Sequence, residues 1–536
     1  MAIFIWAIGD YSGLLYNLIN MCMSQRKIFN MLFVLIALMS FVIRYFQSVN
    51  FDFPFTYDQA LTIIDLRTMA HFYDFKILGP TTSITGLSVG PYYNFFLLPA
   101  YWLGMGNPQY LVIFSIIVYV AAGAIIYLFF YKKNALLGLL ISSIFLMAPQ
   151  LFPTTRYYWN ANLAVVFDVL YFLAFWNFLE KKSSKNALIW GLSSALTIQF
   201  EAAFGAGCLV FASLWMLSTL NKKYILAFFV AVFPWFIPQI AYEVLNKFAM
   251  SNLLLEVFGG QRNIFGESLS LGEAASSHIR SILSNFEGQF MLPYNFGLYL
   301  LVFVGLISVS IKKQRQIFVG FLKFLIFVFL FYTAIYRHEI KPWYFYGIRV
   351  WYCFSVGLGL AGLFRFAGQK PFTKYAIYLP IVLFLFISFV KTITDQNSYV
   401  KDNGKSNDPK NASNTIKALD WIYEKAGGGG FVAYNYVPEI LDLTDQYMYW
   451  WYGNKNYGYL PEKISYSRDP VPPYVREGDR FLQNAKPSLE GKVALKYERI
   501  GDFDIWLNQF NDFCTLEKEE FSWQVTVEWR ELCDKN

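Results

Sequence analysis

The chain has 536 residues, of which 56% are hydrophobic, 20% are aromatic and only 15% are charged. This composition excludes an ordinary soluble protein and indicates a polytopic membrane protein. The formal net charge of +7 does not indicate a nucleic-acid partner, because the basic residues form short clusters between apolar runs and not one basic face.

Residues 1–28 are predicted to be a cytoplasmic or interfacial lead-in. The first twenty are mildly apolar, but they contain Asp10 and lack the charged start and small-residue cleavage site of a signal peptide. The alternative is that this start is over-extended and that translation begins at Met21 or Met23.

Residues 29–391 are predicted to form a membrane domain. Apolar runs of about 20 residues, long enough to cross a hydrocarbon core, recur through this region, and the basic clusters between them mark the cytoplasmic side. About eleven transmembrane helices are expected, with the N-terminus in the cytoplasm and residues 392–536 outside. The predicted spans are 29–48, 109–131, 135–150, 162–180, 186–200, 203–220, 224–242, 294–311, 316–336, 344–365 and 375–391.

The first exported loop, residues 49–108, contains two further helical segments. The sequence YDQALTIIDLRTMAHFY, from Tyr57 to Tyr73, has apolar residues at helical spacing and predicts an amphipathic helix that lies on the membrane, with Asp58 and Asp65 on one face. The segment Gly90 to Gly104 contains two prolines and is too short to span, which indicates an interfacial or re-entrant helix.

Asp58, at the start of the amphipathic helix, is the candidate catalytic base. A carboxylate in the first turn of a helix is also favoured by the helix dipole alone, which gives a purely structural alternative. The position immediately outside the first span favours the catalytic interpretation, because a base there would take a proton from an acceptor hydroxyl while a lipid phosphate leaves.

Basic residues in two exported turns are candidates for binding a phosphate. The turn RHEIKPWYFYGIR carries four of them on the side of the membrane where basic residues are normally depleted. They either form a cationic socket for phosphate oxygens or touch lipid headgroups as solvated charges. The arginine in RYYWNANL either grips the donor phosphate or belongs to an interfacial aromatic belt. These five candidates are Arg156, Arg337, His338, Lys341 and Arg349.

Two carboxylates near the exported side have alternative roles. Glu201 stands in a short turn, where it either belongs to the site or is a solvated charge at a helix end. Asp168 lies within a predicted span, where ionisable groups are costly, and is expected to hold a structural hydrogen-bond network.

Residues 392–536 are predicted to form an extracytoplasmic α/β domain after a flexible polar linker, Asp395 to Asn414. The sequences NTIKALDWIYEKA and PEILDLTDQYMYWWYG predict helices, FVAYNYV and KVALKYERI predict strands, and GGGG predicts a turn. The aromatic residues from Tyr447 to Tyr452 face the membrane, an acceptor glycan or the core of the domain. The five cysteines lack metal-ligand spacing. Cys514 and Cys533 either form a disulfide or remain two free thiols.

A series of short motifs resembles bacterial GT-C glycosyltransferases, specifically the broad group of protein O-mannosyltransferase-like and aminoarabinose-transferase-like enzymes. The resemblance lies in the order of the motifs, and it extends over most of the membrane region. The motifs are Tyr57-Asp58-Gln59, Gly79-Pro80, Thr85-Gly86, Gly90-Pro91-Tyr92-Tyr93, Arg156 to Leu163, the turn at Gln199, Tyr242-Glu243 and the aromatics from Trp343 to Tyr346.

The resemblance implies a multi-pass, inverting glycosyltransferase of the cytoplasmic (inner) membrane with Asp58 as its base. Such an enzyme moves a hexosyl or pentosyl group from a polyprenyl-phosphate carrier to a hydroxyl or amine of a lipid, glycan or protein acceptor outside. No cofactor is required, because arginine and lysine can stabilise a phosphate leaving group, and a divalent metal is also compatible. The competing hypothesis is a non-catalytic transporter or flippase of lipid-linked saccharides, in which the charged residues line a path.

The chain departs from the family pattern on the acceptor side. The family commonly has Asp-Glu where this chain has Asp58-Gln59, a second acid where it has Asn160 and Asn162, and, in close relatives, Gln-x-His-Tyr where it has Gln199-Phe200-Glu201-Ala202. A diverged acceptor pocket is therefore expected, with Glu201 as the second carboxylate. The predicted sugar or acceptor pocket comprises Tyr57, Gln59, Tyr92, Tyr93, Asn160, Asn162, Gln199, Glu201, Glu243 and Tyr344.

Overall fold

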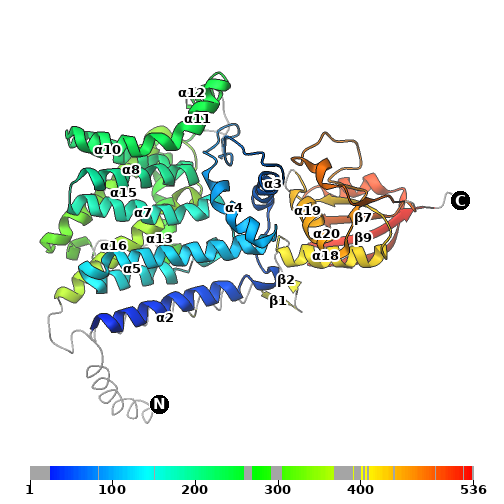
Figure 1. Ribbon diagram of the computed structural model, residues 1–536, viewed down its shortest axis with the longest axis horizontal. Helices are drawn as coiled ribbons and strands as arrows, with labels where there is room; N and C mark the ends of the chain where they lie inside the picture. Colours follow the sequence, from blue (N-terminus) through cyan, green and yellow to red (C-terminus); the bar gives the residue numbers. More distant parts are fainter. Residues whose placement is uncertain are drawn as a thin grey trace, which may run out of the picture.

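The chain forms a helical body and a sheet-containing domain, with helices α3 (Tyr57–Phe72) and α4 (Tyr92–Gly104) between them (Figure 1). The computed structural model describes residues 25–82, 84–149, 151–258, 268–290, 303, 305–308, 310–366 and 390. In the C-terminal region it describes residues 400–402, 405–406, 410–438, 441–488, 490–522 and 524–533.

The helical body consists of apolar helices packed side by side (Figure 1). In the described part of the chain, six helices are long and apolar enough to cross a membrane. The predicted spans from 29–48 to 224–242, and those at 316–336 and 344–365, coincide with helices. The spans predicted at 294–311 and 375–391 lie largely outside the described residues, so the total of eleven stays a prediction. The helices are α2 (Gln25–Phe46), α5 (Pro108–Met147), α6 (Leu151–Thr155), α7 (Asn160–Glu180), α8 (Ser184–Phe200), α9 (Ala202–Ser218), α10 (Lys222–Val232), η2 (Phe233–Phe236), α11 (Ile237–Leu245), α12 (Ala249–Phe258), α13 (Leu271–Phe290), α15 (Lys312–Ile335), η3 (Pro342–Phe345) and α16 (Tyr346–Phe366).

Helix α5 contains two of the predicted spans and reverses between them. Asn134 has non-helical dihedrals (φ −161°, ψ 92°), directly after the basic pair Lys132 and Lys133. The hydroxyl of Tyr119 donates to the carbonyl of Phe145 (2.7 Å), and their rings stack with centroids 4.4 Å apart. A straight helix would separate residues 26 positions apart by about 39 Å, so the two halves pack as an antiparallel pair, as the basic cluster predicted.

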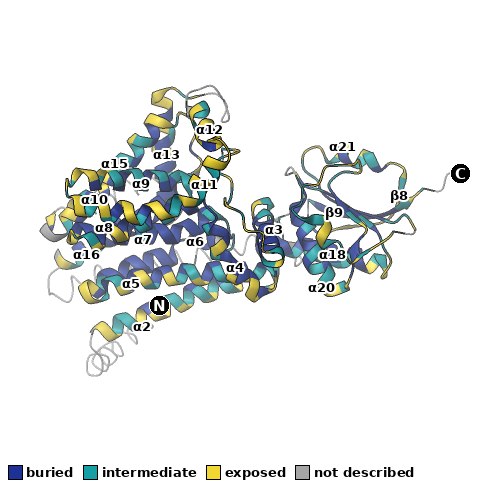
Figure 2. Ribbon diagram, turned by 45° about the horizontal axis from the view of Figure 1, so that its top comes forward, coloured by how far each residue is buried: buried dark blue, intermediate teal, exposed yellow. Residues whose placement is uncertain are grey.

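Helices α3 and α4 confirm the two helical segments expected in the first exported loop, but the environment of α3 differs from the prediction. An amphipathic helix lying on the membrane would bury one face, whereas α3 buries every residue from Gln59 to Met69 except Leu61 (Figure 2). Helix α4 packs on one side of α3 and α19 (Leu443–Met448) of the C-terminal domain packs on another. Asp58 is exposed while Asp65 is only 8% exposed, because the C-terminal domain covers the second half of α3.

The C-terminal domain is built on a five-stranded sheet of order β5-β3-β7-β9-β8. Strand β3 pairs in parallel with β5 and β7, and β9 pairs antiparallel with β7 and β8. The predicted strands FVAYNYV and KVALKYERI are β3 and β7, and the helix predicted from Asn414 is α18. The main elements are α18 (Ala412–Ala426), β3 (Val432–Tyr436), α19, η4 (Tyr449–Gly453), α20 (Asn454–Tyr457), β4 (Leu460–Pro461), β5 (Lys463–Ser465), η5 (Gly478–Phe481), β6 (Ala485–Lys486), β7 (Val493–Glu498), α21 (Phe503–Leu507), η6 (Asn508–Phe510), β8 (Phe513–Glu520) and β9 (Val525–Leu532).

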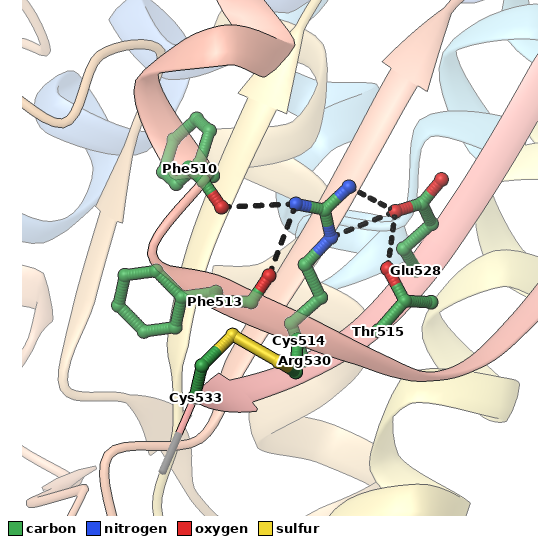
Figure 3. The surroundings of a disulfide bond; sticks show 7 residues. All are labelled: Phe510, Phe513, Cys514, Thr515, Glu528, Arg530 and Cys533. Atoms are coloured by element: carbon green, nitrogen blue, oxygen red, sulfur yellow. Dashed lines mark hydrogen bonds and ion pairs between the residues drawn. A yellow bond between two sulfur atoms is a disulfide. The ribbon is translucent and has the colours of Figure 1, made fainter. Parts of the chain in front are cut away.

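The β8–β9 hairpin is closed by a disulfide between Cys514 and Cys533, which settles the two alternatives for these cysteines (Figure 3). Next to it, Arg530 donates to the carbonyl of Phe510 (3.0 Å) and pairs with Glu528. This hairpin was not predicted from the sequence, because β8 is an edge strand that is almost entirely exposed and lacks the alternation of apolar and polar residues that marks a half-buried strand.

Two other expectations about the C-terminal region have clear outcomes. The aromatic cluster belongs largely to the core of the domain, since Tyr447 and Tyr449 are fully buried. Within the linker predicted to be flexible, β1 (Val400–Asp402) and β2 (Lys405–Ser406) form a short antiparallel pair, so that part of the prediction is wrong. The linker also contacts the loop between α2 and α3, because Phe55 N donates to the carbonyl of Lys410 (2.8 Å).

Candidate functional site

Asp58 lies in the first turn of α3, on an exposed end of an otherwise buried helix. Gln59 Oε1 accepts a hydrogen bond from Thr56 N (3.2 Å), so Gln59 holds the start of the helix. The hydroxyl of Tyr157 lies 2.6 Å from Thr56 Oγ1 and 3.4 Å from Asp58 Oδ2. Burial, and then the charge of Asp58, raise the pKa of the half-buried Tyr57. Asp58 is thus a positioned carboxylate with an accessible side chain.

A chain of aromatic rings connects Asp58 to the basic turn from Arg337 to Lys341. The ring of Tyr157 is 6.0 Å from that of Trp159, and Trp159 is 6.3 Å from Trp343 in η3. Trp343 is in turn 6.0 Å from Tyr344. These contacts bring together the N-terminal ends of α3, α7 and α16, which are far apart in the sequence.

The basic turn has three basic side chains at or near its surface. Arg337 and Lys341 are exposed, and Lys341 Nζ lies 3.6 Å from Glu339. His338 is half-buried, with its ring 5.4 Å from that of Tyr336. Helix α13 supports the turn, because His278 Nε2 donates to the carbonyl of His338 (3.3 Å). The turn therefore presents positive charge on a backbone held by a neighbouring helix.

The other two predicted phosphate ligands are engaged elsewhere. Arg349 lies in α16, 5% exposed, and donates from Nε to Asn285 Oδ1 (2.8 Å), so its assignment to the exported turn is wrong. The prediction extended the turn too far, because the helix begins at Tyr346. Arg156 donates to the carbonyl of Asp52 and lies 3.4 Å from its carboxylate.

Glu201 forms the junction between α8 and α9, next to the start of α7. Its carboxylate accepts from Ala203 N (3.0 Å), while Asn160 Nδ2 donates to the carbonyl of the preceding Phe200 (2.7 Å). Burial raises the pKa of Glu201 to about 7. Asp168 lies deeper in α7 and is 2% exposed, and its Oδ1 has no hydrogen-bond partner among the described residues, so the expected hydrogen-bond network is not found at this atom.

The remaining predicted pocket residues mostly hold the backbone. Gln199 Oε1 accepts from Gly90 N (2.7 Å) and from Gln239 Nε2 (2.7 Å), and Gln199 Nε2 donates to the carbonyl of Trp235 (2.9 Å). A Cβ atom at position 90 would collide with Gln199, which explains the glycine there.

Aromatic and amide side chains extend this framework. Tyr93 is fully buried and its hydroxyl donates to the carbonyl of Tyr158 (2.6 Å). Asn162 Nδ2 donates to the carbonyl of Tyr157 (2.8 Å), which fixes the tyrosine next to Asp58. Tyr92 instead packs against Trp235, with ring centroids 4.7 Å apart.

Glu243 lies apart from this group. Its two carboxylate oxygens accept from Met250 N (2.9 Å) and Ser251 N (3.0 Å), so it caps α12. The Tyr242-Glu243 motif therefore supports a local helix start in this chain, which the sequence pattern alone did not distinguish from a pocket residue.

The arrangement suits proton abstraction next to an anionic group. Asp58 can accept a proton, Tyr157 can orient its carboxylate, and Arg337, His338 and Lys341 can neutralise negative charge. Tyr157 is the functional candidate that the sequence analysis did not assign, although it stands beside Arg156 in RYYWNANL. Only the tertiary packing places its hydroxyl at Asp58. Within the described part of the chain, no three histidine, cysteine, aspartate or glutamate side chains gather so as to hold a metal ion.

No protein-family model matches the chain, and no curated protein matches its sequence. Among solved structures, ArnT from Cupriavidus metallidurans bound to undecaprenyl phosphate is similar over 92% of this chain and 97% of its own, with a TM-score of 0.55 and 11% identity. The apo state of the same protein is similar over 94% of this chain and 98% of its own, with a TM-score of 0.56 and 11% identity. The mycobacterial arabinofuranosyltransferase AftD has a TM-score of 0.42 and 13% identity over 96% of this chain and 40% of its own. The ArnT structures show that this chain has the GT-C fold of membrane glycosyltransferases.

Proposed function

We propose that this protein is an inverting glycosyltransferase that moves a sugar from a polyprenyl-phosphate donor to an acceptor on the outer face of the cytoplasmic membrane. The observation that carries the proposal is the position of Asp58, which combines an exposed carboxylate, a tyrosine at hydrogen-bonding distance and an aromatic path to a basic turn. The GT-C fold supports the reaction class, and the undecaprenyl phosphate bound to ArnT supports a polyprenyl-phosphate partner.

In the proposed reaction, Asp58 takes the proton from a hydroxyl or amine of the acceptor while the acceptor oxygen or nitrogen attacks the anomeric carbon. The new glycosidic bond forms on one face of the sugar while the bond to the phosphate oxygen breaks on the other, which inverts the anomeric configuration. The electron pair of the broken bond stays on the polyprenyl phosphate. A positioned general base contributes typically about 10²–10⁴-fold to such a step.

The basic turn is the proposed binding site for the donor phosphate. Arg337 and Lys341 are exposed, and His338 lies beside them on the same supported backbone. Cationic donors that face the phosphate stabilise the charge that grows as the polyprenyl phosphate leaves. Arg156 and Arg349 are assigned to structural roles, because each is tied to a partner away from the turn.

The acceptor or sugar pocket is proposed to lie around Asn160 and Glu201, with Tyr57 and Tyr344 at its edges. Glu201 is the second carboxylate of the group, and burial raises its pKa to about 7, so it changes protonation near neutral pH. It can accept or donate a hydrogen bond to a sugar hydroxyl according to its protonation state.

Asp58→Asn tests the proposed base. Purified protein in liposomes receives polyprenyl-phosphate sugars and an extract of cell-envelope acceptors, and release of polyprenyl phosphate is followed by mass spectrometry. The variant is expected to lose about 100-fold or more of the turnover while donor binding by native mass spectrometry persists. Asp504→Asn, which changes an exposed acid in α21 of the C-terminal domain, is the control and is expected to keep its activity. Unchanged turnover in Asp58→Asn would remove Asp58 from the role of base.

Arg337→Ala tests the phosphate site separately. Native mass spectrometry of the detergent-extracted protein, with and without polyprenyl-phosphate sugars, is expected to show a bound lipid whose occupancy falls in the variant. Binding of no such lipid to the wild-type protein would contradict the proposed function.

A further inference from the structure

The seam between α3 and the C-terminal domain contains a pocket that the proposed reaction does not use. Its volume is about 580 Å³, within the range of about 300–1,000 Å³ that is typical of small-molecule sites. Its lining combines aromatic rings with side chains that donate and side chains that accept hydrogen bonds. This composition suits the hydroxyls and apolar faces of sugars. Residues that line it include Arg67, Gln446, Trp450, Glu462, Tyr474 and Phe481.

Among the described lining residues, Arg67 is buried without a carboxylate partner and with an unpaired hydrogen-bond donor. It is 2% exposed, and its guanidinium lies 3.8 Å from the ring centre of Phe481 and 4.8 Å from that of Trp450. Its Nη2 donates to the carbonyl of Arg476 (3.3 Å), whereas Nε has no hydrogen-bond partner among the described residues. No carboxylate in the described part of the chain pairs with it.

A buried guanidinium without a counter-charge is unfavourable, because neither water nor an anion compensates its desolvation. Burial accordingly lowers the pKa of Arg67 to about 10, a value at which it remains charged at neutral pH. The surrounding rings attract the cation but supply no full negative charge. An anionic group that enters the pocket would supply both the charge and a hydrogen-bond acceptor.

The location of Arg67 separates the pocket from the proposed base. Arg67 follows Asp58 by nine residues, or about two and a half turns of the same helix, so the two side chains leave α3 on opposite faces and about 14 Å apart along the axis. The contact of α3 with α4 and α19 holds this arrangement. A saccharide held at Arg67 therefore occupies a site distinct from the one at Asp58.

We propose that the pocket between α3 and the C-terminal domain binds an acidic saccharide, with Arg67 receiving its carboxylate or phosphate and Trp450, Tyr474 and Phe481 contacting its rings. This inference goes beyond the proposed function, because the pocket lies on the face of α3 opposite to Asp58 and its saccharide is not assigned to the transfer step.

Saturation-transfer NMR on the full-length protein in detergent tests this site with defined probes. Tetragalacturonic acid carries carboxylates, its fully methyl-esterified form is the neutral counterpart of the same size, and trehalose 6-phosphate presents a phosphate. Binding of either acidic probe about tenfold tighter than the ester supports the proposal, and the stronger acidic probe identifies the anionic group. Equal binding of acid and ester, or no binding of either acidic probe at millimolar concentration, would overturn it.

Variants assign the binding to the pocket and separate it from the transfer reaction. Arg67→Gln is expected to weaken binding of the acidic probe about tenfold. Arg480→Gln, at the rim of the pocket, is expected to weaken it to a smaller degree. The Arg480 side chain is 61% exposed, so its replacement leaves the fold intact. Arg499→Gln removes the same charge on another face of the domain and should leave binding unchanged. Binding that is insensitive to both pocket variants would overturn the assignment.

The test does not depend on turnover. Asp58→Asn is expected to bind the acidic probe as the wild type does, even though it abolishes transfer. If the wild type binds the probe but transfers no sugar from any polyprenyl-phosphate donor, the proposed function fails and the pocket stands. If it transfers sugar but does not bind the probe, the pocket assignment fails and the enzyme stands.

Discussion

Arg156 gives the sharpest test of whether a conspicuous basic residue serves structure or donor binding. Its guanidinium donates to the carbonyl of Asp52 and lies 3.4 Å from the carboxylate, with side chains that are 13% and 28% exposed. At an effective dielectric constant of 20, this separation corresponds to a gross attraction of about 5 kcal/mol. Desolvation offsets part of that attraction, so a net contribution of about 1.5–3 kcal/mol to the free energy of unfolding is expected.

The pair also fixes the loop between α2 and α3. Asn411 Nδ2 donates to the same carboxylate oxygen of Asp52 (2.6 Å), so Arg156, this loop and the start of α18 meet at one acid. Arg156→Gln should therefore destabilise the protein by about 2 kcal/mol and leave the affinity for polyprenyl-phosphate lipids unchanged.

Chemical unfolding of Arg156→Gln, Asp52→Asn and the double variant forms the assay, together with native mass spectrometry of lipid binding. If the pair acts as described, the two single changes will not add, and the coupling will be about 1–2 kcal/mol. Additive effects on stability, combined with a loss of lipid binding in Arg156→Gln alone, would refute this reasoning and return Arg156 to the donor site.

Three further changes test the C-terminal domain and the α8–α9 junction. Lys496 and Asp445 form a buried ion pair with 2.7 Å between Nζ and Oδ1. Lys496→Met should lower the free energy of unfolding by about 3–5 kcal/mol, because it leaves the buried carboxylate unpaired. Adding Asp445→Asn should recover most of this loss in thermal unfolding. Glu201 has a pKa raised from 4.5 to about 7, so the folded state binds an extra proton between those pH values. Stability therefore falls as the pH rises through this window. Glu201→Gln should flatten the fall in melting temperature measured from pH 5 to 8. Replacing Cys514 by serine opens a loop with a sequence separation of 19 and should lower the free energy of unfolding by about 3 kcal/mol, a loss that reductant should reproduce in the wild type but not in the variant.

The apolar helices could be predicted from the sequence because each is determined locally. Length and hydropathy identify a span, and Lys132 and Lys133 identified the reversal within α5 that a continuous apolar run would have concealed. The same local information predicted α3 and α4. It did not predict the burial of α3, because the partner that covers it, α19, lies nearly 400 residues later in the chain.

The residues of the candidate site also fall into two groups, those that local sequence features indicate and those whose roles depend on the fold. Asp58 could be proposed from the sequence because its position depends on one helix start and one span, both of which are local features. The partners of Arg156 and Gln199 are distant backbone atoms, and those of Glu243 are backbone atoms of a helix start that the sequence pattern did not reveal. Residue type alone therefore suggested a ligand where the fold uses a hydrogen-bonding support. Tyr157 was missed for the opposite reason, since its neighbours in sequence give no sign that it meets Thr56 and Asp58.

The structure also gives the C-terminal domain a role in the proposed chemistry. Its α19 packs on α3, Tyr447 donates to the carbonyl of Gly106 (2.6 Å) just beyond α4, and Arg476 lies 3.5 Å from Asp65 in the middle of α3. Because α3 carries Asp58 at one end, the orientation of the proposed base depends on a domain that contributes no residue to the proposed transfer step. A helix held only by the membrane surface could tilt, whereas one buried between two packed bodies keeps its carboxylate at a fixed distance from Tyr157.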